Sequence, residues 1–448
     1  MRNFILDIFF DFVSSSVSNS FRKLSRTEKS KTTRIDNSYF IKSYKPLIVL
    51  SFTLLLSVTA SFSQENKKRE IFIEPEYMVG RVIPNYVARF PNTHLQHGLA
   101  LNIGSFKTDS TSNWAKYYNY PQTGVSLFYS YIGNNHVFGH QFSIMPFIGF
   151  NVFNKLKKPY YLKVSLGAAY FTSQYDSIDN RKNVNVSSPY TWAFQMGAYK
   201  TLTEKPGMNL KLGFIFSHAS NGHTELPNFG LNSALLSLSA QFYNKETKKY
   251  QFTQSKIKQE RPPRSYDIGV SYGLGFHEYG DKDGPVGGAK KGVQSTSVFL
   301  GKTYNNHFRW GIGATYRFYH VYYQQIMDRD LTKYTSNPNK NSSNIVLFTN
   351  AEFLMSHFSM DIELGFNIYK PFYKQYEEDF PVAKQFKGYS EFKRNFKRTI
   401  TTRLGLKLYA INTNKLPKHN FYIGPHIKAN AGQADFTELA IGYVYRLK

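Results

Sequence analysis

The chain of 448 residues contains no cysteine. Without thiols it has no disulfide framework, no thiolate metal site, no cysteine nucleophile and no cysteine-linked lipid anchor. Acidic residues are also scarce, because 30 Asp and Glu stand against 56 Lys and Arg, which gives a formal net charge of +26. The basic residues are dispersed through strand-like segments and turns. This distribution is typical of a surface that faces anionic lipid head groups and argues against a nucleic-acid partner.

Long apolar runs are lacking as well. The clearest one, residues 46–58, is shorter than the roughly 20 residues that a membrane-spanning helix needs. Lys42 and Lys45 precede this run, and small residues follow it at Ala60, Ser61 and Ser63. The pattern predicts a secretory signal peptide that is cleaved after Ser63, so residues 1–63 are interpreted as an N-terminal extension and signal. An exported chain without a helical anchor or a lipid-linked cysteine is either soluble or a β-barrel.

Aromatic residues, in contrast, are abundant. Phe, Tyr and Trp make up 17% of the chain, although its mean hydropathy is negative. This combination favours a transmembrane β-barrel, in which apolar outward residues alternate with polar inward ones and aromatic girdles lie at both membrane interfaces. A soluble all-β protein is the alternative.

Alternation of apolar and polar residues recurs in sixteen segments of about ten residues, separated by polar turns. Eight segments precede residue 245, namely 71–79, 96–104, 122–132, 138–152, 160–171, 190–201, 208–220 and 232–243. Eight more follow it, namely 264–276, 293–304, 307–320, 344–354, 357–370, 397–411, 420–428 and 437–447. Eight antiparallel strands are enough to close a small barrel whose interior is filled by side chains.

Residues 248–264, which contain Pro262 and Pro263, are polar and basic and predict an extended linker between two similar halves. We therefore expect an all-β protein with two antiparallel eight-stranded transmembrane barrels in tandem, over residues 64–247 and 265–448. One sixteen-stranded barrel is the alternative. The linker favours two barrels, because neighbouring strands of one barrel are usually joined by short turns.

A His-x-Ser pair ends the segment 208–220. Leu212, Phe214, Phe216, His218 and Ser220 share one face of the predicted strand, and this face is apolar until its outer end. The alternation predicts that His218 and Ser220 lie side by side on the lipid-facing wall near the outer rim. An imidazole is the usual base that activates a serine hydroxyl. Alone, the pair is a weak signal, since a His and a Ser near a strand end commonly just occupy the polar interface.

The longer run around this pair is more specific. His218-Ala-Ser220-Asn221-Gly222 is followed by Pro227-Asn228-Phe-Gly230-Leu-Asn232. It resembles the lipid A 3-O-deacylase (PagL-like) family, whose signature is a His-x-Ser-Asn-Gly or similar run, then Pro-Asn-x-Gly and a closing strand. The resemblance is close over about 25 residues and looser over the first half of the chain.

The resemblance implies an outer-membrane esterase that removes an ester-linked acyl chain from lipid A or a related lipid, with its active site on the outer wall of the barrel. Ser220 would be the nucleophile and His218 the general base. The backbone N–H of Asn221 and the side chain of Asn228 would stabilise the oxyanion. The partners implied are lipid A or lipopolysaccharide and the membrane. We predict no cofactor and no metal site.

One position departs from the family pattern. Where the family usually has an acidic residue that orients the histidine, this chain has Asn232. An amide oxygen can accept a hydrogen bond from the ring, as in Cys-His-Asn enzymes, but it stabilises an imidazolium less than a carboxylate does. Two alternatives stay open, namely that Glu225 in the loop supplies the acid or that the site has decayed.

The second half echoes the pattern only in part. It contains His426 and Glu438, but Lys428 occupies the position of the serine, and the alternation turns His426 towards the lumen. We expect His426 and Glu438 to belong to a buried polar network inside a degenerate, structural or substrate-supporting barrel. The alternative function for the whole chain is a non-enzymatic barrel, either a pore or a structural or adhesion protein.

Overall fold

The structure is a computed structural model, and each of its barrels is described by itself. It describes residues 70–85, 90–106, 113–118, 120–152, 160–244, 264–281, 284, 288, 290–380, 392 and 395–447. The predicted signal peptide and all but the last residue of the predicted linker lie outside the described residues. The domain boundaries therefore stay predictions.

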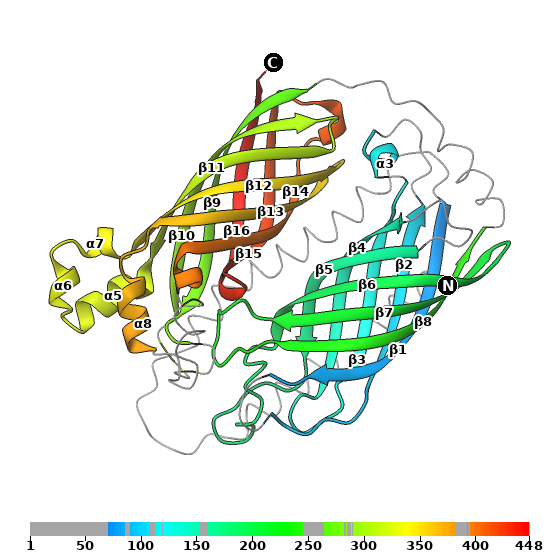
Figure 1. The fold of residues 1–448 in the computed structure, drawn as a ribbon, viewed down its shortest axis with the longest axis horizontal. Helices are drawn as coiled ribbons and strands as arrows, with labels where there is room; N and C mark the ends of the chain where they lie inside the picture. Colours follow the sequence, from blue (N-terminus) through cyan, green and yellow to red (C-terminus); the bar gives the residue numbers. More distant parts are fainter. Residues whose placement is uncertain are drawn as a thin grey trace, which may run out of the picture. The chain divides into compact units, whose positions relative to one another are not determined.

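The first eight strands form a closed antiparallel barrel in which each strand pairs with its neighbours in sequence (Figure 1). They are β1 (Glu70–Ile83), β2 (Gln96–Phe106), β3 (Gln122–Tyr131), β4 (His140–Val152), β5 (Tyr160–Phe171), β6 (Tyr190–Lys205), β7 (Met208–Ser220) and β8 (Leu231–Tyr243). A short helix, α3 (Asn113–Tyr117), lies between β2 and β3. The barrel closes where β8 pairs with β1, with Ile83 opposite Asn232 at one end.

The last eight strands form a second closed antiparallel barrel. They are β9 (Ser265–Glu278), β10 (Lys290–Tyr304), β11 (Phe308–Tyr319), β12 (Ser343–Met355), β13 (Phe358–Tyr369), β14 (Ile400–Tyr409), β15 (His419–Asn430) and β16 (Gln433–Leu447). Between them lie α5 (His320–Asp328), α6 (Thr332–Thr335), α7 (Pro338–Asn341), α8 (Tyr373–Asp379) and the 3₁₀ turn η4 (Thr413–Lys415). Two eight-stranded barrels are thus confirmed, and the single sixteen-stranded barrel is wrong.

The expected alternation runs along the strands. In β1, Ile71, Ile73 and Tyr77 are exposed, whereas Phe72, Glu74, Glu76 and Met78 are buried. The outward side chains are thus apolar, whereas the inward set includes buried carboxylates, which is the pattern of a membrane barrel. Within the described residues, no helix is both long and apolar enough to cross a membrane.

Polar side chains fill the interior of the first barrel. The Nζ atom of Lys163 lies 2.8 Å from Oε2 of Glu76, and Asn102 and Tyr199 each donate a hydrogen bond of 2.9 Å to the same carboxylate. A second group joins Glu74 to Lys211 at 2.9 Å. These charges are buried, and buried charges are tolerated because they are paired and hydrogen-bonded.

Replacing Glu76 by Leu should destabilise the first barrel strongly, because the ammonium of Lys163 would be left buried without its carboxylate. Losing one partner of a buried ion pair costs about 3–5 kcal/mol. Glu76→Gln is the matched control, since it keeps the shape and part of the hydrogen bonding and should cost less. Urea unfolding of the full chain in lipid vesicles measures both. Equal stability of Glu76→Leu and the wild type would contradict the role of this network.

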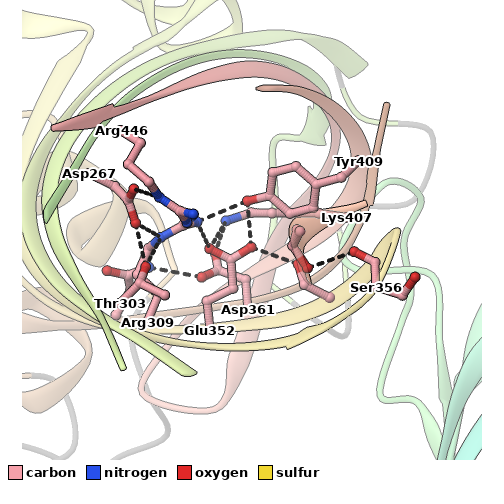
Figure 2. Close-up of polar contacts among 12 residues, drawn as sticks. Asp267, Thr303, Arg309, Glu352, Ser356, Asp361, Lys407, Tyr409 and Arg446 are labelled. Atoms are coloured by element: carbon pink, nitrogen blue, oxygen red, sulfur yellow. Dashed lines mark hydrogen bonds and ion pairs between the residues drawn. The ribbon is translucent and has the colours of Figure 1, made fainter. Parts of the chain in front are cut away.

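The second barrel is filled in the same way (Figure 2). Arg309 contacts Asp267 at 2.9 Å and Glu352 at 2.7 Å. Tyr409 donates a hydrogen bond of 2.7 Å to Glu352, and Lys407 lies 3.2 Å from Asp361. These side chains extend across the interior of the second barrel and fill it.

The two residues that echo the first-half pattern are also buried in this lumen. Glu438 accepts a hydrogen bond of 2.6 Å from Arg403, and His426 lies opposite Glu438 in the pairing of β15 with β16. His426 itself donates from Nδ1 to the carbonyl oxygen of Gly424 at 3.0 Å. Both residues are buried, so the expected lumen-facing placement is correct.

An aromatic cluster fills one end of the second barrel. It joins inward residues of the strands to the connections that carry α5 and α8, and its buried members are Tyr279, Val293, Tyr319, Val321, Tyr322, Ile326, Tyr334, Phe372 and Phe436. Bacterial outer-membrane barrels have short periplasmic turns and longer extracellular loops. The end with α5 to α8 is therefore the outer one. By the same rule, the outer end of the first barrel is the one opposite the two-residue turn between β6 and β7.

Candidate active site

The candidate site lies where β7 ends and the chain turns into the connection to β8. Two glycines bound this connection in the left-handed region, Gly222 with φ of 72° and Gly230 with φ of 70°. Residues with a Cβ atom rarely adopt this backbone conformation, so these turns favour glycine. Just before Gly222, the side chain of Asn221 accepts a hydrogen bond of 2.9 Å from the backbone N–H of His223, which reverses the chain.

The connection between β5 and β6 holds this loop in place. Gly230 donates its N–H to the carbonyl oxygen of Asn185 at 3.1 Å, and the Asn185 side chain donates back to the carbonyl oxygen of Gly230 at 2.7 Å. The side chain of Asn221 donates to Ser187 Oγ at 3.0 Å, and Ser187 donates to the carbonyl oxygen of Glu225 at 2.7 Å. Preorganised loops of this kind keep catalytic groups in fixed positions.

His218 and Asn232 form a cross-strand pair. They are direct partners in the register of β7 with β8, and Nδ1 of His218 lies 2.7 Å from Oδ1 of Asn232. An amide oxygen only accepts, so this contact selects the tautomer that carries its proton on Nδ1. The Nε2 atom of His218 is then unprotonated and available as a base. His218 lies on the same face as the exposed residues Leu212 and Phe214, which agrees with the expected outward placement.

Ser220 is buried at the end of β7, with only 6% of its surface exposed. Its Oγ atom accepts a hydrogen bond of 2.9 Å from Nδ2 of Asn228 and one of 3.3 Å from the backbone N–H of Gly222. A direct contact between Ser220 and His218 is not among the hydrogen bonds of the described residues. Such contacts are often long in free enzymes and tighten only with substrate.

Gly230 leaves the space in which these groups meet. A Cβ atom on Gly230 would lie 3.0 Å from Cε1 of the His218 ring and 3.4 Å from Cβ of Ser220. The imidazole and the serine side chain therefore both border the same small volume, and a larger residue at position 230 would occupy it. The sequence pattern alone could not show this, because it depends on how the loop folds back over β7.

Two loop residues titrate outside their ordinary ranges because they are buried. Burial lowers the pKa of His223 to about 4, so this second histidine is neutral at pH 7. Burial raises the pKa of the Glu225 carboxyl above its usual range. The contacts of Glu225 described above involve its backbone oxygen, whereas the ring of His218 already has Asn232 as its partner.

The structure thus brings together His218, Asn232, Ser220 and Asn228, four of the residues that the sequence singled out. The backbone N–H found beside Ser220 Oγ is that of Gly222, and the expected role of the Asn221 N–H stays a prediction. Sequence reasoning missed Asn185 and Ser187, because they lie in an irregular loop distant in sequence from the motif.

Fold and site together define the class: this is an outer-membrane β-barrel protein whose first barrel carries a Ser-His-Asn group on its outward face. The family match makes the class more specific. Residues 101–241 match the family described as lipid A 3-O-deacylase (PagL), so the resemblance of the first barrel to that family is confirmed. The match includes every candidate site residue.

Comparisons with solved structures give outer-membrane barrels. The outer membrane enzyme PagL is 16% identical, with 37% of this chain and 97% of that chain covered and a TM-score of 0.28. The outer membrane protein OpdK from Pseudomonas aeruginosa is 10% identical, with 85% and 98% covered and a TM-score of 0.19. A BenF-like porin from Pseudomonas fluorescens Pf-5 is 9% identical, with 85% and 98% covered and a TM-score of 0.19. No curated protein matches the chain.

Proposed function

We propose that the first barrel is an esterase that hydrolyses an ester-linked acyl chain of lipid A or a related membrane lipid, as the family match suggests. One observation carries the proposal. An outward-facing histidine, held by Asn232 at 2.7 Å, borders the same space as a serine whose Oγ already receives two N–H donors. A base, a residue that orients it, a nucleophile and nearby N–H donors are the groups that acyl transfer needs.

The reaction would proceed through an acyl-serine. Nε2 of His218 takes the proton of Ser220, and Oγ forms a bond to the ester carbonyl carbon. The resulting oxyanion receives hydrogen bonds from Nδ2 of Asn228 and from backbone N–H groups at the start of the loop. The ester C–O bond then breaks, and His218 gives its proton to the sugar oxygen that leaves. His218 then takes a proton from a water molecule, whose oxygen bonds to the acyl carbonyl carbon. The bond from that carbon to Oγ breaks, the chain leaves as a fatty acid, and Ser220 regains its proton from His218.

The location of the site suits a lipid substrate. His218 and Asn232 are outward residues near the outer ends of their strands, where a membrane lipid presents its ester bonds and where water is available for the second half-reaction. The interiors of both barrels are occupied by paired polar side chains together with buried hydrophobic clusters. That filling gives no support to the alternative of a pore.

Incubating the purified full chain with lipid A tests the proposal. We expect the mass of lipid A to fall by one acyl chain and an equal amount of free fatty acid to appear, both measured by mass spectrometry. A diacyl phospholipid in a parallel reaction shows whether the enzyme requires a sugar-linked ester. If neither lipid loses an acyl chain under conditions in which the barrel is folded, the proposed function is wrong.

A further inference from the structure

Arg81 is a charged residue on the outward wall of the first barrel. It lies near the outer end of β1, where its side chain is exposed while its neighbour Val82 is buried. An arginine on the lipid face costs about 2–4 kcal/mol at the bilayer midplane and about 0–1 kcal/mol near the interface. A cation in such a position therefore lies at the level of the lipid head groups.

The position of Tyr77 on β1 supports the placement of Arg81 at the level of the lipid head groups. The hydroxyl of Tyr77 lies 2.8 Å from Nδ1 of His97, and both residues are exposed on the outward wall. Tyrosines of this kind mark the boundary between the hydrocarbon region and the head groups. Arg81 is four residues further towards the outer end, which is about 13 Å along the strand.

The strand register places Arg81 beside the candidate site. Arg81 pairs with Ala234 of β8, and Ala234 pairs with Phe216 of β7. In the next outward row, Asn232 pairs with His218. Two strand spacings, about 10 Å, thus separate β1 from β7. Ala234, a small residue, lies between them in the row of Arg81, whereas Ile83 of β1 pairs with Asn232 in the row of His218.

No other lysine or arginine takes this place among the described outward residues near the outer ends of β6, β7, β8 and β1. On β6 these residues are Tyr190, Trp192 and Phe194, and on β1 they are Val79, Arg81 and Ile83. The surroundings of the site are therefore aromatic or apolar on one side and carry a single guanidinium on the other.

We propose that Arg81 binds a phosphate group in the head group of the lipid whose ester Ser220 would cleave. The guanidinium is the side chain best suited to a phosphate, because its planar fork donates two parallel hydrogen bonds. The substrate is then a lipid that carries both an ester and a phosphate within the distance between β7 and β1. This inference rests on the proposed function, and it makes phosphate a determinant of specificity.

The test compares lipid A with lipid A from which a phosphatase has removed the phosphates. For each protein, the ratio of kcat/KM on the two substrates is measured. We expect the wild type to prefer the phosphorylated lipid by about tenfold to 100-fold, as charge-assisted hydrogen bonds allow, with the difference in KM. In Arg81→Gln the ratio should fall to about 1, and Arg81→Lys should retain part of it.

Lys200→Gln is the matched control. Lys200 is an exposed, outward cation of β6, but it pairs with Leu212, far from the outer end. Each change removes one exposed cation from the lipid-facing wall, whereas a specific contact is lost only in Arg81→Gln. A wild-type ratio in Arg81→Gln, or an equal fall of the ratio in Lys200→Gln, overturns the proposal.

A binding measurement separates this inference from the proposed function. Native mass spectrometry of Ser220→Ala with each form of lipid A reports binding without hydrolysis. We expect about tenfold stronger binding of the phosphorylated form, and loss of this preference in the double variant Ser220→Ala/Arg81→Gln. Absence of hydrolysis by the wild type would refute the esterase, whereas equal binding by the two variants would refute the role of Arg81.

Discussion

Ser220→Ala is expected to reduce the release of fatty acid from lipid A by at least about 10³-fold. In serine hydrolases the nucleophile and base act as a unit, and removing either leaves only the rate enhancement from the oxyanion donors and substrate binding. Under the proposed mechanism those donors are Asn228 and backbone N–H groups of the loop, and the substitution at Ser220 removes none of them. Initial rates by mass spectrometry measure the effect.

Ser217→Ala is the control for this change. Ser217 lies three residues earlier on the same strand, but it is buried on the lumen side and pairs with Ser233. The same loss of a hydroxyl should leave the rate within about twofold of the wild type, because it is separated from the site by the barrel wall. Activity of Ser220→Ala equal to that of Ser217→Ala would remove Ser220 from the mechanism.

Substitutions of Asn232 have the second largest expected effect. They should lower or raise kcat, depending on the side chain that replaces the amide. Asn232→Leu should lower kcat by about 10²-fold or more, because the His218 ring loses the acceptor that holds its tautomer. Asn232→Asp keeps the shape and should raise kcat by about tenfold, because a carboxylate stabilises the imidazolium that forms as Ser220 attacks. Steady-state kinetics on lipid A in mixed micelles gives both values.

Glu225→Gln tests the alternative acid. The loop carboxyl is replaced without a change of size, and the backbone oxygen that accepts from Ser187 is unaffected. With Asn232 as the orienting residue, this variant should retain wild-type kcat. If Glu225→Gln is slow and Asn232→Leu is not, the acid is Glu225 and the assignment to Asn232 is wrong.

Most of the fold could be predicted because alternate residues of a barrel strand face the lipid and the barrel interior, and their polarity alternates accordingly. All sixteen strands were expected, but several ends were drawn short, and the largest shortfalls, of four residues each, are in β1, β6 and β16. β1 continues to Ile83, β15 to Asn430, and β16 begins at Gln433. The missed residues include Asn430 and Asp435, which are polar and lie inside the second barrel. Asp435, which looks like part of a turn in the sequence, forms a buried ion pair of 2.6 Å with Lys428.

The candidate site could be predicted only in outline. The motif named Ser220, His218, Asn228 and Asn232, since these residues are close in sequence and their turn chemistry is characteristic. The supporting residues Asn185 and Ser187 come from another loop, and their contacts with Gly230 and Asn221 depend on how two irregular segments fold together. Irregular segments lack a periodicity from which contacts follow.

The side of the wall on which His218 lies was determined by the sequence itself. Successive residues of a strand point to opposite faces, and the apolar face of residues 208–220 has to meet lipid. Whether Asn232 reaches that histidine was decided only by the tertiary structure. The register of β7 with β8 makes the two residues direct partners at 2.7 Å, and a slip of one residue would have turned Asn232 to the lumen. The same register, continued across Ala234, brings Arg81 towards the site.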